Sequence, residues 1–381
     1  MPGSKKASKH QFFIFGYYGW KNVGDDAMLY ALLRELHSLH SKAGVAVLCP
    51  IPVVVPPEVR SKTKFVKLSP FAVGWEILRS SAFIIGGGSH LFDYGSNIKA
   101  LIIQSRILIL VLYSRLLRKK VYLLNIGLGP FRTAWGSFLT RSICYLAHYI
   151  SVRDETSYRF LASPRLKSKT SLAFDSSALI EPLNEAKNNF IKASNKWILG
   201  VSVTTVFEIY HASRDKDVLL VDRMAEQLSE WLAKESRAEV CLFVFKGESK
   251  DDDVLITRLL QDRLQPAERV RLVQYDPDPR SMLAQVAYCN AFVGMRYHSC
   301  LFAYLNSIPL LIIDYHPKCR ALANEIGLPK HAVVSLEEIL NGQFQDQLEN
   351  LVNSPSDFCA TLPISVAKTR ARDGIRRVKL P

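Results

Sequence analysis

The sequence lacks the features that mark several common protein classes. Its seven Cys include no C-x-x-C pair, so neither a disulfide framework nor a zinc site is indicated. Its most apolar stretch, 101–117, has an unbroken apolar core of only 107–113, far below the roughly 18 residues that span a bilayer. We therefore predict that 101–117 is a buried helix. The first residues lack a long apolar segment with a cleavage site, which favours a cytoplasmic protein.

Familiar nucleotide and nucleic-acid motifs are also missing. The loop 15–26 is neither a G-x-G-x-x-G fingerprint nor a P-loop that ends in Gly-Lys-Ser/Thr. Because no helix-turn-helix, RNP or zinc-finger pattern appears, we expect no nucleic-acid partner. What is present, 48% apolar and 22% charged residues, indicates a globular protein with a large core.

Acidic residues are too few to balance the basic ones. The chain has 49 Lys plus Arg against 35 Asp plus Glu, which gives a net charge of +14. Much of the excess lies in a basic N-terminal tail, 1–10, and in the last fourteen residues. We expect these tails to be solvated, and they are the candidates for peripheral contact with anionic lipids at the inner face of a membrane.

Strand and helix patterns alternate along the chain, and its length suggests two domains. Such alternation implies right-handed crossovers and parallel sheets. The predicted strands are 11–15, 45–48, 82–85, 121–126, 149–152, 197–203, 238–245, 270–273, 291–293 and 309–313, and the predicted helices are 25–40, 101–117, 219–236, 253–264, 280–288 and 299–306.

A polar stretch rich in Asn and Lys, 181–196, separates two groups of elements. We predict a Rossmann-like domain at 11–182, a linker at 183–196, a second Rossmann-like domain at 197–352, and a C-terminal segment with a basic tail at 353–381. The predicted fold class is α/β, with two doubly wound domains that face a shared cleft, the usual ligand site of such proteins.

Two glycine-rich loops follow predicted strands and are candidates for ligand binding. Glycine lets a backbone approach a bound group, and the N–H groups of a helix N-terminus attract anions. Ligand contact is the better interpretation of 86–89, whereas a tight turn with Asp25 as helix N-cap explains 15–26 equally well. The candidate residues are Gly16, Tyr18, Gly19, Asn22, Asp25, Gly86, Gly87, Gly88 and Ser89.

An arginine follows a predicted strand at two further places. Arg153 could grip a carboxylate or phosphate, or form a surface salt bridge, while Asp154 could orient it or cap the next helix. Arg296 and His298 open a helix, so that a fixed charge, a titratable imidazole and a helix dipole converge. This suits an anionic substrate that needs a proton, although capping and pairing with carboxylates is the alternative.

The order of these motifs resembles the polysaccharide pyruvyl transferases, which include bacterial enzymes that pyruvylate cell-wall and exopolysaccharide sugars. The resemblance covers about residues 12–330. It rests on Gly16-Tyr17-Tyr18-Gly19 with Asn22-Val23-Gly24-Asp25, Gly86-Gly87-Gly88-Ser89 with Asp93, Val152-Arg153-Asp154 with Ser157, Met295-Arg296-Tyr297-His298, and the stretch 315–328 that contains Lys318.

The resemblance implies the GT-B arrangement, with phosphoenolpyruvate as donor co-substrate and a sugar hydroxyl pair, free or lipid-linked, as acceptor. It assigns Arg153 and Arg296 to the donor's carboxylate and phosphate, and His298 to proton delivery. Lys318 is a further donor-side candidate, as is Tyr297, at a position where Leu is expected in relatives.

The same resemblance places the N-terminal glycine loop and Asp93 on the acceptor side. Ketal formation requires a proton on the enol carbon, addition of one hydroxyl, loss of phosphate, and addition of the second hydroxyl. A base, Asp93 or Asp25, must take a hydroxyl proton. The scheme requires no metal and no cofactor.

Two alternatives remain open on the sequence alone. A GT-B glycosyltransferase that uses a nucleotide sugar shares the fold, and a nucleoside diphosphate would stabilise it against heat where phosphoenolpyruvate would not. A non-enzymatic protein that binds membrane surfaces or nucleic acid would show steep salt dependence carried by its basic tail.

Overall fold

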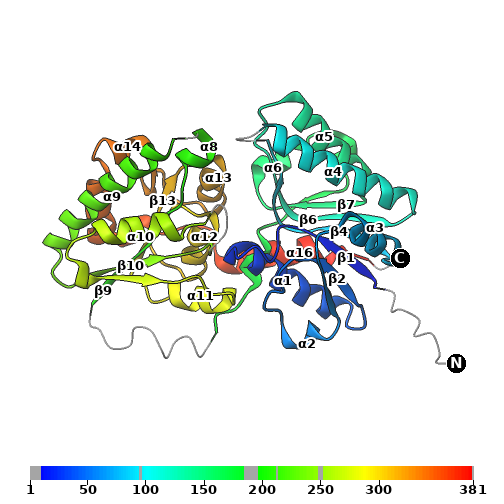
Figure 1. Ribbon diagram of the computed structural model, residues 1–381, viewed down its shortest axis with the longest axis horizontal. Coiled ribbons are helices and arrows are strands. Elements are labelled where there is room, and N and C mark those ends of the chain that lie inside the picture. The colour runs from blue at the N-terminus through cyan, green and yellow to red at the C-terminus, as the bar shows by residue number, and fades with distance from the viewer. Residues whose placement is uncertain (1–9, 94–96, 184–195, 212, 248–251, 380–381) are drawn as a thin grey trace. The chain divides into compact units, whose positions relative to one another are not determined.

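The computed structural model describes residues 10–93, 97–183, 196–211, 213–247 and 252–379. The chain forms two compact units (Figure 1). The first unit contains 1–20, 28–179 and 368–381, and the second contains 21–27 and 180–367. One boundary lies near residue 180, where 182 was expected, and each unit also takes a segment from the other side of it. The expected tail 1–10 and linker 183–196 lie almost wholly outside the described residues.

The first unit is built on a parallel sheet in the order β3-β2-β1-β4-β6-β7-β8, and β5 also pairs with β6. Its strands are β1 (Phe12–Phe15), β2 (Val45–Leu48), β3 (Thr63–Val66), β4 (Ala82–Ile85), β5 (Gly88–Leu91), β6 (Lys120–Leu128), β7 (Tyr149–Val152) and β8 (Thr170–Leu172). Its helices are α1 (Val23–Leu39), which begins in the second unit, α2 (Pro57–Arg60), α3 (Pro70–Arg79), α4 (Asn97–Leu116), α5 (Ala134–Leu146), α6 (Glu155–Phe160), α7 (Pro164–Lys167) and the end of α16 (Ile364–Arg376).

The second unit has a parallel sheet in the order β11-β10-β9-β12-β13-β14. Its strands are β9 (Trp197–Ser202), β10 (Ala238–Phe243), β11 (Val270–Val273), β12 (Ala291–Gly294), β13 (Leu310–Asp314) and β14 (Val333–Ser335). Its helices are α8 (Phe207–His211), α9 (Arg214–Lys234), α10 (Val254–Arg263), α11 (Pro279–Val286), α12 (Tyr297–Leu305), α13 (Pro317–Ile326), α14 (Leu336–Leu340) and α15 (Phe344–Asn353). The predicted fold class, α/β with two Rossmann-like units, is confirmed.

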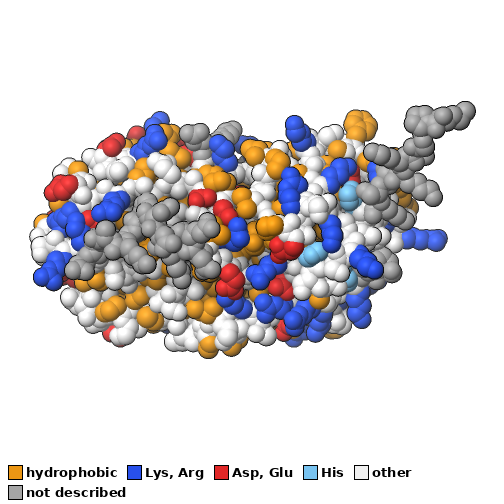
Figure 2. Space-filling view, turned by 90° about the horizontal axis from the view of Figure 1, so that it is seen from below, with side chains coloured by type: hydrophobic (Ala, Val, Ile, Leu, Met, Phe, Trp, Pro, Cys, Tyr) orange, Lys and Arg blue, Asp and Glu red, His pale blue; other side chains and the backbone are white. Residues whose placement is uncertain are grey.

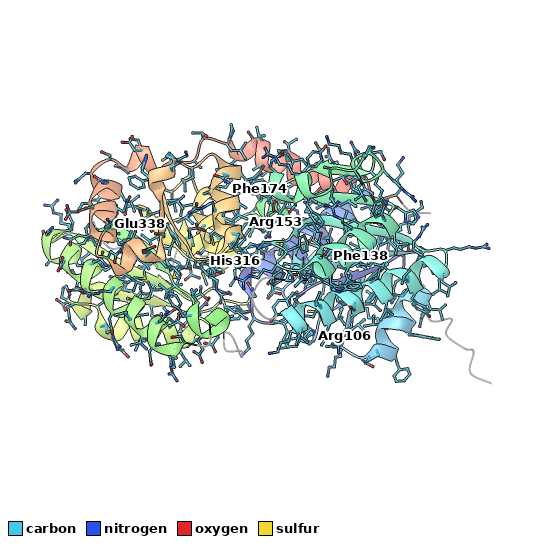
Figure 3. The ribbon with its side chains drawn as sticks, turned by 90° about the horizontal axis from the view of Figure 1, so that it is seen from above. Arg106, Phe138, Arg153, Phe174, His316 and Glu338 are labelled. Atoms are coloured by element: carbon cyan, nitrogen blue, oxygen red, sulfur yellow. The ribbon has the colours of Figure 1, made fainter. Side chains whose placement is uncertain are left out.

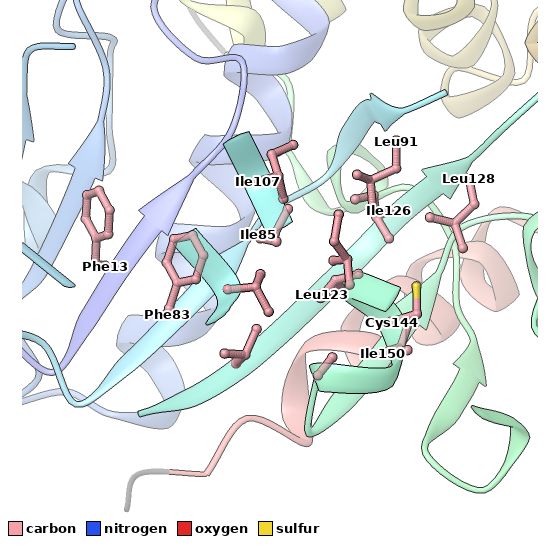
Figure 4. Packing of buried hydrophobic residues seen from close by; sticks show 14 of the residues in the cluster. Phe13, Phe83, Ile85, Leu91, Ile107, Leu123, Ile126, Leu128, Cys144 and Ile150 are labelled. Atoms are coloured by element: carbon pink, nitrogen blue, oxygen red, sulfur yellow. The ribbon is translucent and has the colours of Figure 1, made fainter. Parts of the chain in front are cut away.

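Short strands that are apolar throughout form both sheets because helices cover both faces of each sheet. In β2 and β4 every residue is buried. The core of the first unit joins sheet residues such as Phe83 to the inner sides of α3, α4 and α5, through Ile77, Ile107 and Cys144 (Figure 4). α4 and α5 lie on one side of this sheet and α1 lies on the other (Figure 1).

The loop at 86–88 continues a strand after a kink. β4 pairs with the first half of the nine-residue β6, and β5 pairs with its last half. Gly86 and Gly87 separate the two short strands, and Gly88 has a φ of +116°, which disfavours any side chain. The glycines therefore allow the chain to bend between β4 and β5, so that both strands pair with β6.

Two expectations about exposure are wrong. α4 was expected to be buried, but its outer side leaves Ile98, Ile109 and Leu116 exposed. The C-terminal basic segment was expected to be solvated, but it forms much of α16, with Ala371 and Ile375 fully buried. In each case one face of the helix is buried and the opposite face is exposed, which composition alone does not reveal.

Candidate active site

The second unit gathers most of the predicted donor residues at the C-terminal edge of its sheet. Arg296 follows β12 and is the N-cap residue of α12. Its Nε donates to Asp253 Oδ1 at 2.8 Å and Oδ2 at 3.0 Å, and its Nη2 also donates to Oδ1. Asp253 is fully buried and accepts a further hydrogen bond from Lys246 N at 2.9 Å. The carboxylate thus fixes the plane of the guanidinium, which has more N–H donors than one carboxylate can accept.

His298 lies in the first turn of α12 and is held between two neighbours. The Tyr297 ring meets it edge-on, with centroids 5.0 Å apart and planes at 79°. On the other side, a Cβ added to Gly24 would overlap the imidazole. Gly24 is therefore glycine because the ring occupies the space of its side chain.

The start of α1 belongs to the second unit and brings Gly24 to this site. Val23 N donates to Phe245 O at 3.0 Å, and Gly247 N donates to Lys21 O at 2.9 Å. The expectation that Asn22 and Asp25 belong to the first domain is thereby corrected, because 21–27 packs with His298 in the second unit. Their acceptor-side role stays a prediction.

The helix begins earlier than expected. α1 starts at Val23, and the side chain of Asn22 accepts from Gly24 N at 3.1 Å, as an N-cap residue does. Asp25 therefore lies inside the first turn and is not the cap. It is half-buried, so its carboxylate adds negative charge to a helix start that favours it.

Residues that follow β13 line the same site. Tyr315 is buried, and burial raises the pKa of its phenol well above the ordinary value, so it stays neutral. Lys318 Nζ lies 5.4 Å from the centre of the Tyr315 ring. His316 is buried as the N-cap of α13, where its Nδ1 accepts from Lys318 N at 3.2 Å.

The first unit holds Arg153 in a similar setting (Figure 3). Arg153 is only 4% exposed, and its Nη1 donates to the fully buried Asp175 at 3.1 Å. A Cβ on Gly127 would lie 2.9 Å from its Nε, so the guanidinium lies against the backbone. Asp154 serves both suggested purposes, since it caps α6 through Ser157 N at 2.8 Å and lies 3.8 Å from Arg153.

His90 is a candidate that sequence reasoning missed. It lies on β5, and its Nε2 is buried without a hydrogen-bond partner among the described residues. Burial lowers the pKa of His90 to about 4, a hydrogen bond to the Gly87 backbone opposes this, and the charge of Arg153 lowers the pKa further. The imidazole is therefore neutral at pH 7, with Nε2 as its basic nitrogen. Its place directly after the glycine loop was the signal available in the sequence.

Packing explains most of the predicted ligand-binding glycines. Side chains on Gly16 or Gly86 would overlap the Tyr18 ring, which is fully buried. A Cβ on Gly87 would lie 2.7 Å from Met28 Sδ. Gly19 has a φ of +72°, which a turn requires. The glycines thus make room for the protein's own side chains, and the side chain of Ser89 lies outside the described ones.

Asp93 does not fit the predicted role of catalytic base. It is fully buried, and its carboxylate accepts from Thr133 N at 2.8 Å, from Thr133 Oγ1 and from Arg132 N. Both oxygens are engaged in holding the loop that precedes α5. A buried carboxylate bound in this way is a structural acceptor.

The two groups of site residues lie in different units, so the joint action of Arg153 with Arg296 and His298 stays a prediction. None of the seven cysteines, all of which lie among the described residues, forms a disulfide bond. Among the described residues, no three His, Cys, Asp or Glu side chains are placed to hold a metal ion. No helix in the same part of the chain is both long and apolar enough to cross a membrane.

Comparisons with known proteins give a family and a fold. A family model described as polysaccharide pyruvyl transferase matches residues 22–317. UDP-GlcNAc 2-epimerase from Methanocaldococcus jannaschii has a TM-score of 0.61 at 11% identity, and the match covers 97% of this chain and 99% of that one.

Other solved structures show the same likeness. The Neisseria meningitidis UDP-GlcNAc 2-epimerase bound to UDP-GlcNAc has a TM-score of 0.59 at 12% identity over 96% of this chain and 97% of that one. The Anabaena protein HepE in complex with UDP-glucose has a TM-score of 0.54 at 12% identity over 96% of each chain. At such low identity, these structures establish the fold alone.

Proposed function

The chain belongs to the polysaccharide pyruvyl transferase family, and on that premise we propose that it transfers the pyruvyl group of phosphoenolpyruvate to two hydroxyls of a sugar, forming a pyruvate ketal and releasing phosphate. The observation that carries the proposal is the guanidinium of Arg296, fixed by buried Asp253, beside His298 at the start of α12. A fixed cation, an imidazole and a helix N-terminus are what an anionic enol ester requires.

The donor is held through its charges. Arg296 offers two parallel hydrogen bonds to the phosphate or carboxylate, and the N-terminus of α12 adds its dipole. Lys318 contributes a second cation from the start of α13. In this proposal Arg153 supplies the third cation from the first unit.

His298, as imidazolium, gives its proton to the methylene carbon of the donor, which becomes a methyl group. The adjacent carbon becomes an oxocarbenium-like centre and is attacked by the first sugar hydroxyl. The bond from that carbon to the phosphate oxygen then breaks, phosphate leaves with the electron pair, and the second hydroxyl closes the ketal. Each hydroxyl loses its proton through a base, and in the overall balance one of these protons restores the imidazolium of His298 while the other leaves with phosphate.

A weak base is enough for the attacking hydroxyls, because attack on a cationic carbon makes them acidic. His90 suits this role better than Asp93, since its Nε2 is basic and the Asp93 carboxylate already accepts three hydrogen bonds. We therefore assign the base to His90 in this proposal, and Asp93 to the support of the α5 loop.

Thermal shift in the presence of ligands tests the donor. Phosphoenolpyruvate should raise the melting temperature of the wild type, because a ligand that binds only the folded state stabilises it. It should have little effect on Arg296→Ala. A shift with uridine diphosphate and none with phosphoenolpyruvate would favour a nucleotide-sugar transferase instead.

A further inference from the structure

The first unit exposes an unusual amount of apolar surface on the outer sides of α3, α4 and α5, which we call the α3–α5 face. Of the 21 large hydrophobic side chains exposed among the described residues, 13 lie between residues 68 and 145. On α3, Phe71 is 90% exposed and Trp75 is 55% exposed. Soluble proteins rarely expose contiguous apolar patches of this kind unless something binds there.

α4 has two apolar sides instead of one. Its inner side contributes Ile107 and Val111 to the core. Its outer side carries exposed Ile98, Ile102, Ile109, Leu112 and Leu116, which recur at helical spacing. The sheet explains only the first set, so the second set requires another apolar environment.

The three helices form one continuous surface. α4 packs along α5 and also contacts α3, and the inner sides of all three join the same core. α5 adds the exposed Trp135 and Phe138 next to α4, where Figure 3 marks Phe138 and Arg106. A groove between α3 and Tyr113 of α4 is lined by Phe71, Trp75 and Leu78.

The exposed charges of this region are positive. Residues 59–153 contain 14 Lys and Arg but only two acids, Glu76 and Asp93, and both acids are buried. Exposed cations on or beside the three helices include Lys99, Arg106 and Arg115. The face shown in Figure 2 differs, since Asp and Glu side chains there lie among the Lys and Arg side chains.

The combination of exposed apolar side chains and exposed cations indicates what binds to the α3–α5 face. Two copies of the chain meeting through this face would bring their cations together with no exposed acid to balance them. A bilayer with anionic head groups offers an apolar layer for the Ile, Leu, Phe and Trp side chains and phosphates for the Arg and Lys side chains.

We propose that the α3–α5 face docks on the surface of a membrane that contains anionic phospholipid. The helices lie in the interface and do not cross it, with Trp75 and Trp135 at head-group depth. In this proposal the helices make the contact, in place of the basic tails that the sequence suggests. Docking itself is independent of the proposed pyruvyl transfer, whereas its use, access to a lipid-linked acceptor, rests on that function.

Sedimentation with lipid vesicles tests the proposal. Wild-type protein should bind vesicles of phosphatidylcholine with phosphatidylglycerol and should bind pure phosphatidylcholine much less. The triple variant Ile98→Gln, Ile109→Gln, Leu116→Gln should bind the mixed vesicles at least about tenfold more weakly, because each change removes a side chain that would be inserted. Its circular dichroism and its turnover of a soluble acceptor should match the wild type.

A matched control changes exposed hydrophobic residues of the second unit, in the variant Ile209→Gln, Leu219→Gln, Leu255→Gln. This variant should keep full vesicle binding. Equal loss in both triples, or vesicle binding that salt abolishes but the α4 triple leaves unchanged, would overturn the proposal.

Oligomeric state gives a second check. Light scattering that shows a dimer in the wild type and a monomer in the α4 triple would identify the face as an interface between copies. Vesicle binding is read without substrate, so a protein that binds vesicles but never consumes phosphoenolpyruvate would count against the proposed function alone.

Discussion

Each unit holds one arginine at the C-terminal edge of its sheet by pairing it with a fully buried aspartate, and the two pairs differ in what surrounds them. Arg153 and Asp175 are almost closed off, with Arg153 against the backbone at Gly127 and near neutral His90. The Arg296 side chain is 17% exposed.

The different surroundings of the two arginine–aspartate pairs suit them to different chemical roles. The Arg296 pair lies beside a helix N-terminus and a half-buried His298, which suits capture of an anion and delivery of a proton. The Arg153 pair keeps a cation next to an imidazole whose Nε2 is buried and which remains unprotonated, which suits a base. Variants of matched residues in the two units can therefore distinguish delivery of a proton to the donor from removal of a proton from the acceptor.

The histidines should give the largest difference. We expect His298→Ala to lower kcat by about 10²–10⁴, the usual size of general acid catalysis, and to leave much of the donor affinity. His90→Ala should lower kcat less, since water can accept a proton from a hydroxyl that attacks a cation. Phosphate release at saturating phosphoenolpyruvate measures both. Unchanged turnover in His298→Ala would remove this residue from the mechanism.

The arginine variants should give the second largest effect. Arg296→Lys should weaken phosphoenolpyruvate binding by roughly ten- to a hundredfold, because a point charge cannot contact Asp253 and the donor with the same fixed geometry. Calorimetric titration measures the affinity. Arg153→Lys is the matched variant, and its main expected cost is stability, since Asp175 would lose a buried partner. Near-normal affinity in Arg296→Lys would contradict the two-pronged contact.

Gly24 should show a positioning effect. Gly24→Ala should displace the His298 ring and lower kcat by about tenfold, as small misplacements of catalytic groups do, with little change in melting temperature. Gly74→Ala, also within a helix, has nothing within 4 Å of the added Cβ and is the control. A kcat for Gly24→Ala equal to that of Gly74→Ala would show that the ring has other space.

The smallest expected effect concerns pH and His90. Between about pH 6.5, its ordinary pKa, and about 4, the unfolded chain binds a proton that the folded chain does not. Stability should therefore fall as pH falls through this window, by at most about 1.4 kcal/mol per pH unit. Burial also lowers the pKa of His10 and His148, so His90→Gln should reduce the slope without abolishing it. An unchanged slope, measured by denaturant unfolding, would show that His90 is protonated in the fold.

Much of the fold could be read from local sequence. Runs such as 45–48 and 82–85 appear as strands with the predicted bounds, because strands buried on both faces are apolar throughout. β3, β5, β8 and β14 were missed, since each has only three or four residues and mixes polar with apolar ones, which gives too little pattern to detect.

The site was predicted only in its local parts. The cluster of Arg296 with His298 lies within three residues of the chain, so its placement at a strand end was predictable. Asp253 lies 43 residues from its partner in a run of acids, and nothing local shows that it is buried. The packing of 21–27 with the second unit depends in the same way on contacts that only the folded chain makes.

The most direct test is the reaction of the purified protein with phosphoenolpyruvate and a panel of hexosides in heavy water, followed by mass spectrometry of the sugar. The account predicts a pyruvate ketal whose methyl group carries one solvent deuterium, together with free phosphate, and formation of both products at least about a hundredfold slower in His298→Ala. No sugar adduct with any acceptor, or an adduct whose carbon chain gained no deuterium, would contradict it.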